Sequence, residues 1–251
     1  SMERVKKLIH YLAPDIPIPE SKEECDDLFK AIRTVWKPQE LPADYWDLQD
    51  AYLIEQAEKK GQTLLLELEE VAPNLYLWQG DITTLKVDAI VNAANHQLLG
   101  CFIPHHRCID NAIHSQAGLQ LRLECYQLME EQGHLEPTGQ AKLTKAYNLP
   151  AKYVIHTVGP IVQGELRKND EDLLVASYQS CLKLAFENRI ERLAFCCIST
   201  GEFHFPNQRA AELAVKTVQD FMIEHPQIKI VFNVFKDEDL TIYKEIISKS
   251  K

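Results

Sequence analysis

The chain has 251 residues, 45% of them hydrophobic, with 9 glycines and 12 prolines, which favours an ordinary folded core over a low-complexity chain. Its formal charge is −10 at pH 7 and its pI is about 5.4, which excludes the basic surface that gives general affinity for nucleic acid or anionic membranes. An anionic ligand would therefore have to be held by backbone N–H groups and helix N-termini.

The apolar runs and the cysteines indicate a cytoplasmic location. No run reaches the roughly 20 apolar residues that span a bilayer, and we find no leader of signal-peptide type. The 7 cysteines are odd in number and scattered along the chain, which disfavours a disulfide framework. We therefore expect reduced thiols in a reducing compartment.

Residues 1–63 are predicted to form a helical extension. Apolar residues recur at helical spacing within 5–12 and again within 20–36, where Val35 is placed on the apolar side. A third helix is predicted from about 42 to 60, closed by Gly61.

Residues 64–251 are predicted to form one α/β domain. Short apolar strands are expected at 64–68, 75–79, 89–92, 142–146, 153–157, 193–198 and 228–235, and helices near 110–132, 170–189, 206–224 and 237–248. This alternation predicts a three-layer α/β/α fold with a mixed, mostly parallel sheet covered on both faces. His156, inside a predicted strand, is interpreted as a hydrogen-bonded core histidine.

The loop after the 89–92 strand carries Cys101, His105, His106 and Cys108. Two thiolates and one imidazole are typical zinc ligands, and three protein ligands leave open the position that a catalytic zinc needs. An exposed pair of free thiols would also be easily oxidised without a metal. The spacing matches no standard zinc-finger pattern, and it does not choose between the two histidines.

Three other strand ends carry residues suited to a nucleotide-like ligand. Asp81, in a Gly-Asp-Ile-Thr turn, could accept a hydrogen bond from an adenine amino group or simply cap the turn. Asn92 and Asn95 bracket two alanines, and their amides suit a ribose as well as they suit a turn. Residues 199–206 form a strand-to-helix turn whose backbone N–H groups could cradle phosphate, or which only connects the two elements.

Taken together, these motifs resemble the macrodomain family of ADP-ribose-binding modules. Residues 74–95 look like the opening of that family, with Gly-Asp-Ile-Thr and Asn-Ala-Ala-Asn, and 139–160 resemble its middle, with Tyr-Val-Ile-His-Thr-Val-Gly-Pro. Residues 199–206 resemble its diphosphate loop. The resemblance extends from about residue 64 to the C-terminus, and several motifs in order are more specific than any one.

The loop at 98–108 departs from most catalytic macrodomains, which carry glycines there. Asp110 nevertheless keeps its place at the start of the following helix. This replacement, together with the helical extension, resembles the zinc-dependent macrodomains of bacteria. That resemblance implies a Zn²⁺ cofactor bound by Cys101, His106 and Cys108, and it favours His106 over His105 by analogy only.

The resemblance also implies roles for residues of an ADP-ribose site. Asp81 and the Ile82 backbone would hold the adenine, and Asn95 would contact the distal ribose while Asn92 supports the turn. The anomeric carbon would be bordered by Ile109 and Asp110. The diphosphate would lie on the backbone of Ser199, Thr200, Gly201, Glu202 and Phe203, with the Phe203 ring beside the distal ribose.

The activity implied is a zinc-dependent hydrolase that removes mono-ADP-ribose from modified protein side chains. Cleavage passes through an oxocarbenium-like ribose and needs an attacking water. The zinc would either activate that water or orient the ribose. Asp110 would orient or deprotonate that water, or stabilise the developing positive charge. The partner implied is a mono-ADP-ribosylated lipoyl-carrier protein modified by a class M sirtuin. The alternatives are a non-catalytic reader with a structural or redox-responsive zinc, and an O-acyl-ADP-ribose deacylase.

Overall fold

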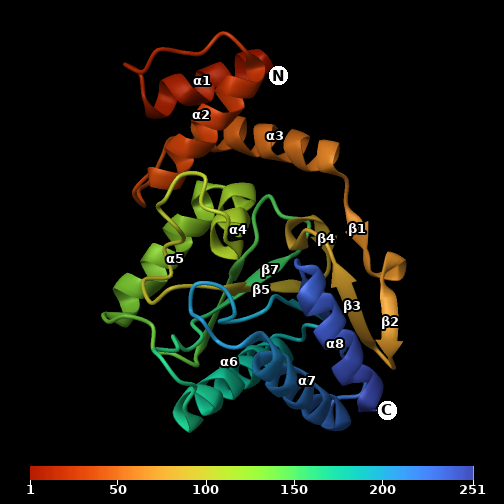
Figure 1. Ribbon diagram of the computed structural model, residues 1–251. Coiled ribbons are helices and arrows are strands. Elements are labelled where there is room, and N and C mark those ends of the chain that lie inside the picture. The colour runs from red at the N-terminus through yellow and green to blue at the C-terminus, as the bar shows by residue number, and fades with distance from the viewer. Residues whose placement is uncertain (251) are drawn as a thin grey trace.

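A seven-stranded sheet forms the centre of the larger unit in the computed structural model, which describes residues 1–250 (Figure 1). Its strand order is β2-β3-β9-β8-β5-β7-β6. Neighbours from β3 to β7 run parallel, and the edge pairs β2·β3 and β6·β7 are antiparallel, which confirms the mixed, mostly parallel sheet. The strands are β2 (Glu69–Ala72), β3 (Leu75–Gln79), β5 (Ala89–Ala93), β6 (Ala141–Lys145), β7 (Tyr153–Thr157), β8 (Arg192–Phe195) and β9 (Lys229–Val234).

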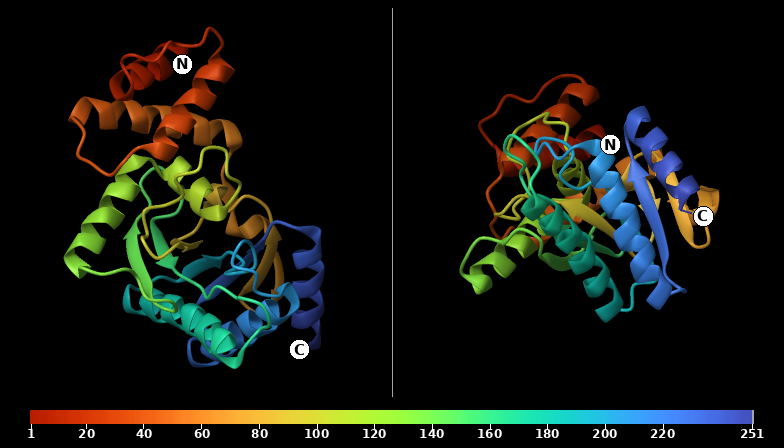
Figure 2. Two further views of the ribbon diagram at one scale, coloured as in Figure 1. Left: turned by 60° about the vertical axis from the view of Figure 1, so that its left-hand side comes forward. Right: turned by 60° about the horizontal axis from the view of Figure 1, so that its bottom comes forward.

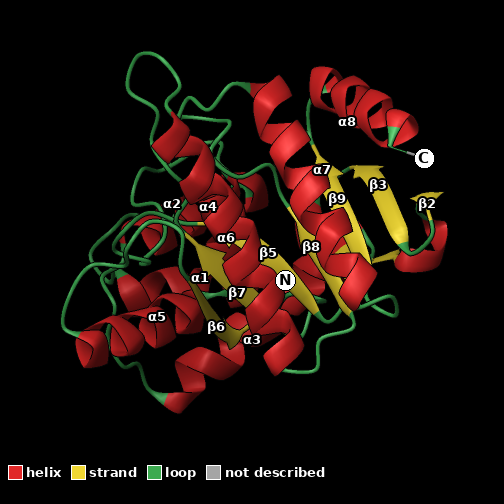
Figure 3. Cartoon of the chain, turned by 90° about the horizontal axis from the view of Figure 1, so that it is seen from below, coloured by secondary structure: helices red, strands yellow, loops and turns green. Residues whose placement is uncertain are grey.

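Helices cover both faces of this sheet, so the predicted three-layer α/β/α architecture is confirmed (Figures 1 and 3). One face carries α4 (Ile109–Ala117) and α5 (Leu119–Gln132), and the other carries α6 (Lys168–Glu187), α7 (Asn207–Glu224) and α8 (Asp237–Lys249). The central strands are almost entirely buried because neither face meets solvent. A short pair, β1 (Thr63–Leu64) and β4 (Leu85–Lys86), lies beside the 3₁₀ turn η2 (Ile82–Thr84). Within residues 1–250, no helix has both the length and the apolar character needed to cross a membrane.

The N-terminal helices form a second hydrophobic cluster that sits over α4 and α5 (Figure 2). They are α1 (Met2–Leu12), α2 (Lys22–Val35) and α3 (Ala43–Lys60). The side chains of Ser1 and Ser21 cap α1 and α2 by accepting hydrogen bonds from the backbone N–H groups of the first turn. Leu119 of α5 belongs to this same cluster, so the extension packs directly onto the α/β domain.

The predicted strand at 64–68 is wrong beyond Leu64. Residues Leu65–Glu67 form a 3₁₀ turn, η1, in which Glu67 Oε2 accepts a hydrogen bond from the Leu64 N–H at 2.6 Å. The Leu66 side chain is 96% exposed, because no layer covers this connector between the extension and the sheet. Val35 is also 49% exposed, contrary to its predicted apolar placement, because α2 ends there.

The predicted single helix at 110–132 is divided at Gly118. This glycine has a φ of +105°, and the Gln49 side chain of the extension accepts a hydrogen bond from the Leu119 N–H at 3.1 Å. A Cβ at residue 118 would lie 2.6 Å from Gln49 Nε2, so a side chain there would collide with the extension. Contact with another part of the chain therefore determines this break.

Candidate active site

The candidate site lies where the parallel strands end. Asp81 follows β3, Asn95 follows β5, and the 199–206 loop follows β8 after the chain leaves the sheet at Phe195, earlier than predicted. Because these strands are parallel, their carboxyl ends meet at one edge of the sheet. The three motifs therefore share the edge at which open α/β sheets bind their ligands.

A cluster of two thiols and one imidazole forms within the 98–108 loop. One ligand atom from each of Cys101, His106 and Cys108 lies within 4.8 Å of the other two, and Cys101 Sγ is 3.5 Å from His106 Nδ1. His105 is not part of this group. Burial, with a further contribution from the neighbouring Cys101, raises the pKa of the Cys108 thiol to about 12, and a bound cation would reverse that shift. The donor set and its compactness fit a zinc ion with one open position.

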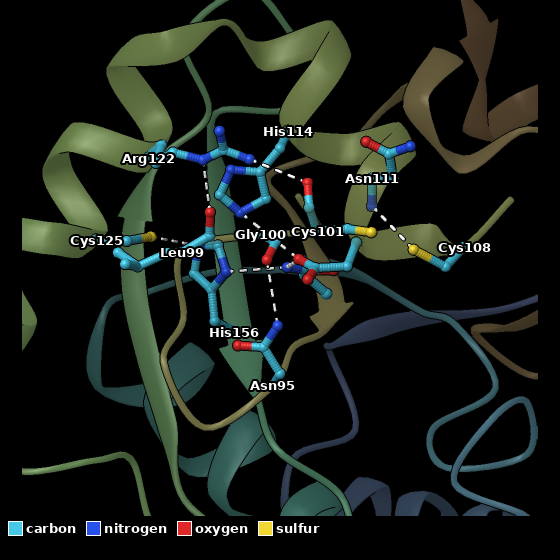
Figure 4. Close-up of polar contacts among 12 residues, drawn as sticks. Asn95, Leu99, Gly100, Cys101, Cys108, Asn111, His114, Arg122, Cys125 and His156 are labelled. Atoms are coloured by element: carbon cyan, nitrogen blue, oxygen red, sulfur yellow. Dashed lines mark hydrogen bonds and ion pairs between the residues drawn. The ribbon is translucent and has the colours of Figure 1, made fainter. Parts of the chain in front are cut away.

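Hydrogen bonds from the first turn of α4 hold this loop in place. The Asn111 N–H donates to Cys108 Sγ at 3.3 Å, so Cys108 is the N-cap of the helix (Figure 4). The Asn111 side chain donates to the His106 carbonyl at 2.8 Å. Two of the three candidate ligands are therefore positioned by one asparagine of a buried helix.

Glu202 connects the cluster to the 199–206 loop. His106 Nε2 lies 2.7 Å from Glu202 Oε1 and donates to that carboxylate, which leaves Nδ1 as the lone-pair nitrogen facing Cys101. A carboxylate on the far nitrogen of a histidine orients the ring and increases its basicity toward a metal. Sequence reasoning missed this contact, since nothing local relates two residues 96 positions apart.

Asp110 lies in the first turn of α4, two residues after Cys108. It is 6% exposed and accepts a hydrogen bond from Asn92 Nδ2 at 2.9 Å, while His114 Nε2 lies 3.6 Å away. Burial raises the pKa of Asp110 to about 6, although the Asn92 hydrogen bond and the charge of Arg122 oppose the shift. Asn92 therefore holds the carboxylate directly, rather than only supporting its own turn.

Asn95 stabilises the segment that leads from β5 into the 98–108 loop. Its amide donates to the Gly100 carbonyl at 3.2 Å (Figure 4), and its Oδ1 accepts from the Gln97 N–H at 3.1 Å. Gly100 has a φ of +85°, and a Cβ there would lie 2.9 Å from the ring of His114, so only glycine allows the loop to pack so closely.

The candidate adenine-binding carboxylate, Asp81, is tied to its own turn and to the extension. Asp81 Oδ1 accepts from the Thr83 N–H at 2.9 Å and from the Thr83 hydroxyl, which caps η2. Asp81 Oδ2 accepts from Lys60 Nζ at 2.8 Å. The Ile82 side chain is buried in the core, so only its backbone is left to face a ligand.

The 199–206 loop has the features of an anion cradle. Ser199 has a φ of +67°, and its carbonyl accepts from the Phe205 N–H at 2.9 Å, which closes the turn. Within residues 1–250, none of the N–H groups of 200–203 donates to a backbone carbonyl. Phe203 packs partly against the core, and its carbonyl accepts from Val162. Thr200, Gly201 and Glu202 thus present unpaired backbone donors.

A second group of possible ligands, His114, Cys125 and His156, lies buried beneath the site. Asn92 Nδ2 donates to His156 Nδ1 at 3.1 Å, so the ring proton is on Nε2, which donates to the Thr144 hydroxyl at 3.0 Å. That hydroxyl donates onward to the Lys145 carbonyl. Both His156 nitrogens are therefore used within the protein, as expected for a core histidine.

We expect His156 to make folding stability depend on pH. Burial lowers its folded pKa to about 3 from an ordinary 6.5, so below that ordinary value the unfolded chain binds a proton that the folded protein excludes. The free energy of unfolding therefore carries no penalty from His156 above about pH 6.5, and it falls as the pH drops toward about 3. Between about pH 7.5 and about pH 5, urea unfolding of the wild type should show a loss about 2 kcal/mol larger than that of His156→Gln.

The exposed-site variant His134→Gln is the control for this measurement, and its pH dependence should match that of the wild type. Because His114 stays in every protein compared, the difference reports on His156 alone. Parallel curves for the wild type and His156→Gln would contradict the expected linkage.

The fold and the site together define a class of protein. Residues 91–214 match the macro domain family, and relatives at 46–49% identity align over almost the whole chain, so this chain belongs to that family. One such relative is the protein-ADP-ribose hydrolase of Treponema medium, 49% identical over 98% of this chain and 98% of its own length. The protein of the same name from Staphylococcus aureus is 46% identical over 92% of this chain and 88% of its own length.

Solved structures support the same family assignment. The Oceanobacillus iheyensis macrodomain with ADP superimposes with a TM-score of 0.66 at 33% identity, covering 73% of this chain and 95% of that one. The Trypanosoma brucei macrodomain in complex with ADP-ribose gives a TM-score of 0.68 at 28% identity, covering 91% of this chain and 97% of that one.

Proposed function

We propose that this protein is a cytoplasmic, zinc-dependent hydrolase that removes mono-ADP-ribose from modified protein side chains. The observation that carries the proposal is the contact of His106 with Glu202, because it brings the candidate metal cluster against the candidate diphosphate loop. Relatives that align over nearly their whole length are named protein-ADP-ribose hydrolases, which supports the same activity here.

Each part of ADP-ribose would be bound by a different group of residues at the sheet edge. Asp81 would accept a hydrogen bond from the adenine amino group, in place of or beside Lys60. The free N–H groups of 200–203 would bind the diphosphate, which a chain of charge −10 could not attract through a general basic field. The distal ribose would then lie between Phe203 and Asn95, with its anomeric carbon near Ile109 and Asp110.

The chemistry proposed for the chain centres on Asp110. Its carboxylate, held by Asn92, would orient the attacking water and accept its proton as the water oxygen bonds to the anomeric carbon and the bond to the side chain breaks. The same negative charge would stabilise the oxocarbenium-like ribose. Cys101, His106 and Cys108 would hold the zinc, which supplies Lewis acidity through its open coordination position.

The direct test is metal analysis combined with an ADP-ribose release assay on mono-ADP-ribosylated proteins. Purified protein should contain stoichiometric zinc, lose turnover after chelation and regain it with added Zn²⁺. Full-rate hydrolysis by the metal-free protein would show that zinc has no catalytic role. Tight ADP-ribose binding without turnover would identify a reader, and turnover of O-acyl-ADP-ribose alone would identify a deacylase.

For the physiological substrate, we propose a lipoyl-carrier protein modified by a class M sirtuin. The support is the resemblance to bacterial zinc-dependent macrodomains described above. A lipoyl-carrier protein bearing mono-ADP-ribose should therefore be processed faster than other modified proteins at equal concentration. Equal rates for all substrates would contradict this preference.

A further inference from the structure

Arg122 of α5 lies at the point where the helical extension meets the loop that carries Cys101. Its side chain is almost fully buried, and its guanidinium bonds to both of these segments. Figure 4 shows its contacts with the loop. Its position within a helix gives no sequence signal of such a role.

On the extension side, the guanidinium donates hydrogen bonds to backbone carbonyl groups at the C-terminal end of α2. Arg122 Nη1 donates to the carbonyl oxygens of Arg33, Thr34 and Trp36 at 3.1, 3.0 and 2.7 Å. The last carbonyls of a helix have no partner within the helix, and they form the negative end of its dipole. A buried cation at this point therefore gives α2 a specific docking point on the α/β domain.

On the other side, the same guanidinium binds the start of the 98–108 loop, which carries the candidate metal ligands and is called the metal loop below. Arg122 Nε donates to the Leu99 carbonyl at 2.6 Å and Nη2 donates to the Cys101 carbonyl at 3.1 Å. The guanidinium carbon lies 3.9 Å from the centre of the Phe102 ring, which adds a cation–π contact. The backbone of a candidate metal ligand is thus bonded directly to Arg122.

Carbonyl groups, one aromatic ring and the charge of Asp110 compensate the charge of this cation. Burial lowers the pKa of Arg122 to about 10, so it remains protonated at neutral pH. Within residues 1–250, the arginines in ion pairs are Arg4 and Arg209, so Arg122 has no carboxylate at ion-pair distance. Without α2, Nη1 would be left buried with unused donors, a costly state that a shift of the guanidinium and of the loop would relieve.

We propose that the helical extension is part of the active-site framework: α2 positions Arg122, and Arg122 positions Leu99–Phe102 and therefore Cys101. The extension also reaches the turn that carries the candidate adenine-binding carboxylate, where Lys60 Nζ donates to Asp81 Oδ2. Residues 1–63 thus bond the Asp81 turn directly through Lys60 and the 98–108 loop through Arg122. Arg122 is a positioning residue that bonds loop and helix simultaneously. The catalytic consequence rests on the proposed hydrolase function.

The test compares Arg122→Lys with the matched variant Arg33→Lys. Arg33 is a second buried arginine of the same interface, where it donates to the Ser115 carbonyl at 3.3 Å, but no hydrogen bond joins it to the metal loop. A lysine retains the charge yet cannot bond α2 and the loop at once. Arg122→Lys should speed hydrogen exchange in 98–108, increase zinc loss to a chelator by about 10–100-fold, and lower kcat more than it changes KM.

Arg33→Lys should lower the melting temperature without these three effects, when both variants are assayed well below their melting temperatures. If Arg122→Lys does not fold, Phe102→Leu, which removes only the ring contact, should produce the same changes at smaller amplitude. Equal effects of Arg33→Lys and Arg122→Lys, or an unaltered loop in Arg122→Lys, would overturn the proposal. Loop exchange is measured without turnover, so it decides the positioning role even if the wild type hydrolyses no substrate.

Discussion

The variant Cys108→Ser is expected to bind no zinc and to release ADP-ribose from modified protein at least about 100-fold more slowly than the wild type. A serine hydroxyl is not deprotonated at neutral pH and does not replace a thiolate as a zinc ligand. Serine is nevertheless a good N-cap, so the bond from the Asn111 N–H that starts α4 can be kept. Metal analysis and the release assay, run on the same preparations, measure both effects.

Cys25→Ser serves as the control for this experiment. Cys25 is buried in the extension, where its thiol donates to the Pro19 carbonyl at 3.3 Å, a bond that a hydroxyl can form. This variant should retain zinc and turnover, and Cys108→Ser should still bind free ADP-ribose through the 200–203 backbone. A zinc-free Cys108→Ser protein with normal turnover would exclude the proposed role of the metal.

The variant Asp110→Asn is expected to lower kcat by about 10²–10⁴-fold while zinc content and ADP-ribose affinity change little. The amide oxygen can still accept the hydrogen bond from Asn92, so the local fold should be kept. The negative charge that would accept a proton and stabilise the ribose cation is removed. Single-turnover release and calorimetric binding of ADP-ribose separate the two quantities.

Asp239→Asn provides a closely matched control. Asp239 is also a buried aspartate in the first turn of a helix, and it also accepts a hydrogen bond from one asparagine, Asn207, at 2.7 Å. It lies at the start of α8, outside the candidate site. Its variant should hydrolyse at the wild-type rate. Similar losses in both variants would point to helix stability rather than to the chemistry of Asp110.

Much of the fold was predictable because it depends on local patterns. Apolar spacing located α1 to α3 and the central strands to within a few residues, since a strand buried on both faces must be apolar throughout. The fold class then followed from the alternation of strands and helices. The errors at 64–68 and at Gly118 have the opposite origin: a connector without a covering layer, and a helix interrupted by Gln49 of the extension.

The candidate site likewise has a part that local sequence predicts and a part that it does not. Cys101, Cys108 and two histidines are close in sequence, so a short loop was sufficient to suggest a shared metal, and the family resemblance favoured His106 over His105. The contacts that define their surroundings join distant residues: Glu202 with His106, Asn92 with Asp110, and Arg122 with both α2 and the metal loop. No periodicity or motif encodes such pairs, because they depend on how separate loops meet at the sheet edge.

The sequence by itself therefore determined the α/β/α class, the residues available for chemistry and the strand ends that carry them, because these follow from local spacing and side-chain type. Only the tertiary structure decided which of these residues meet, and that the helical extension takes part in the site. The physical reason is that a buried guanidinium and a buried carboxylate must find partners wherever the folded chain supplies them. Those partners came from the end of α2 for Arg122 and from the end of β5 for Asp110.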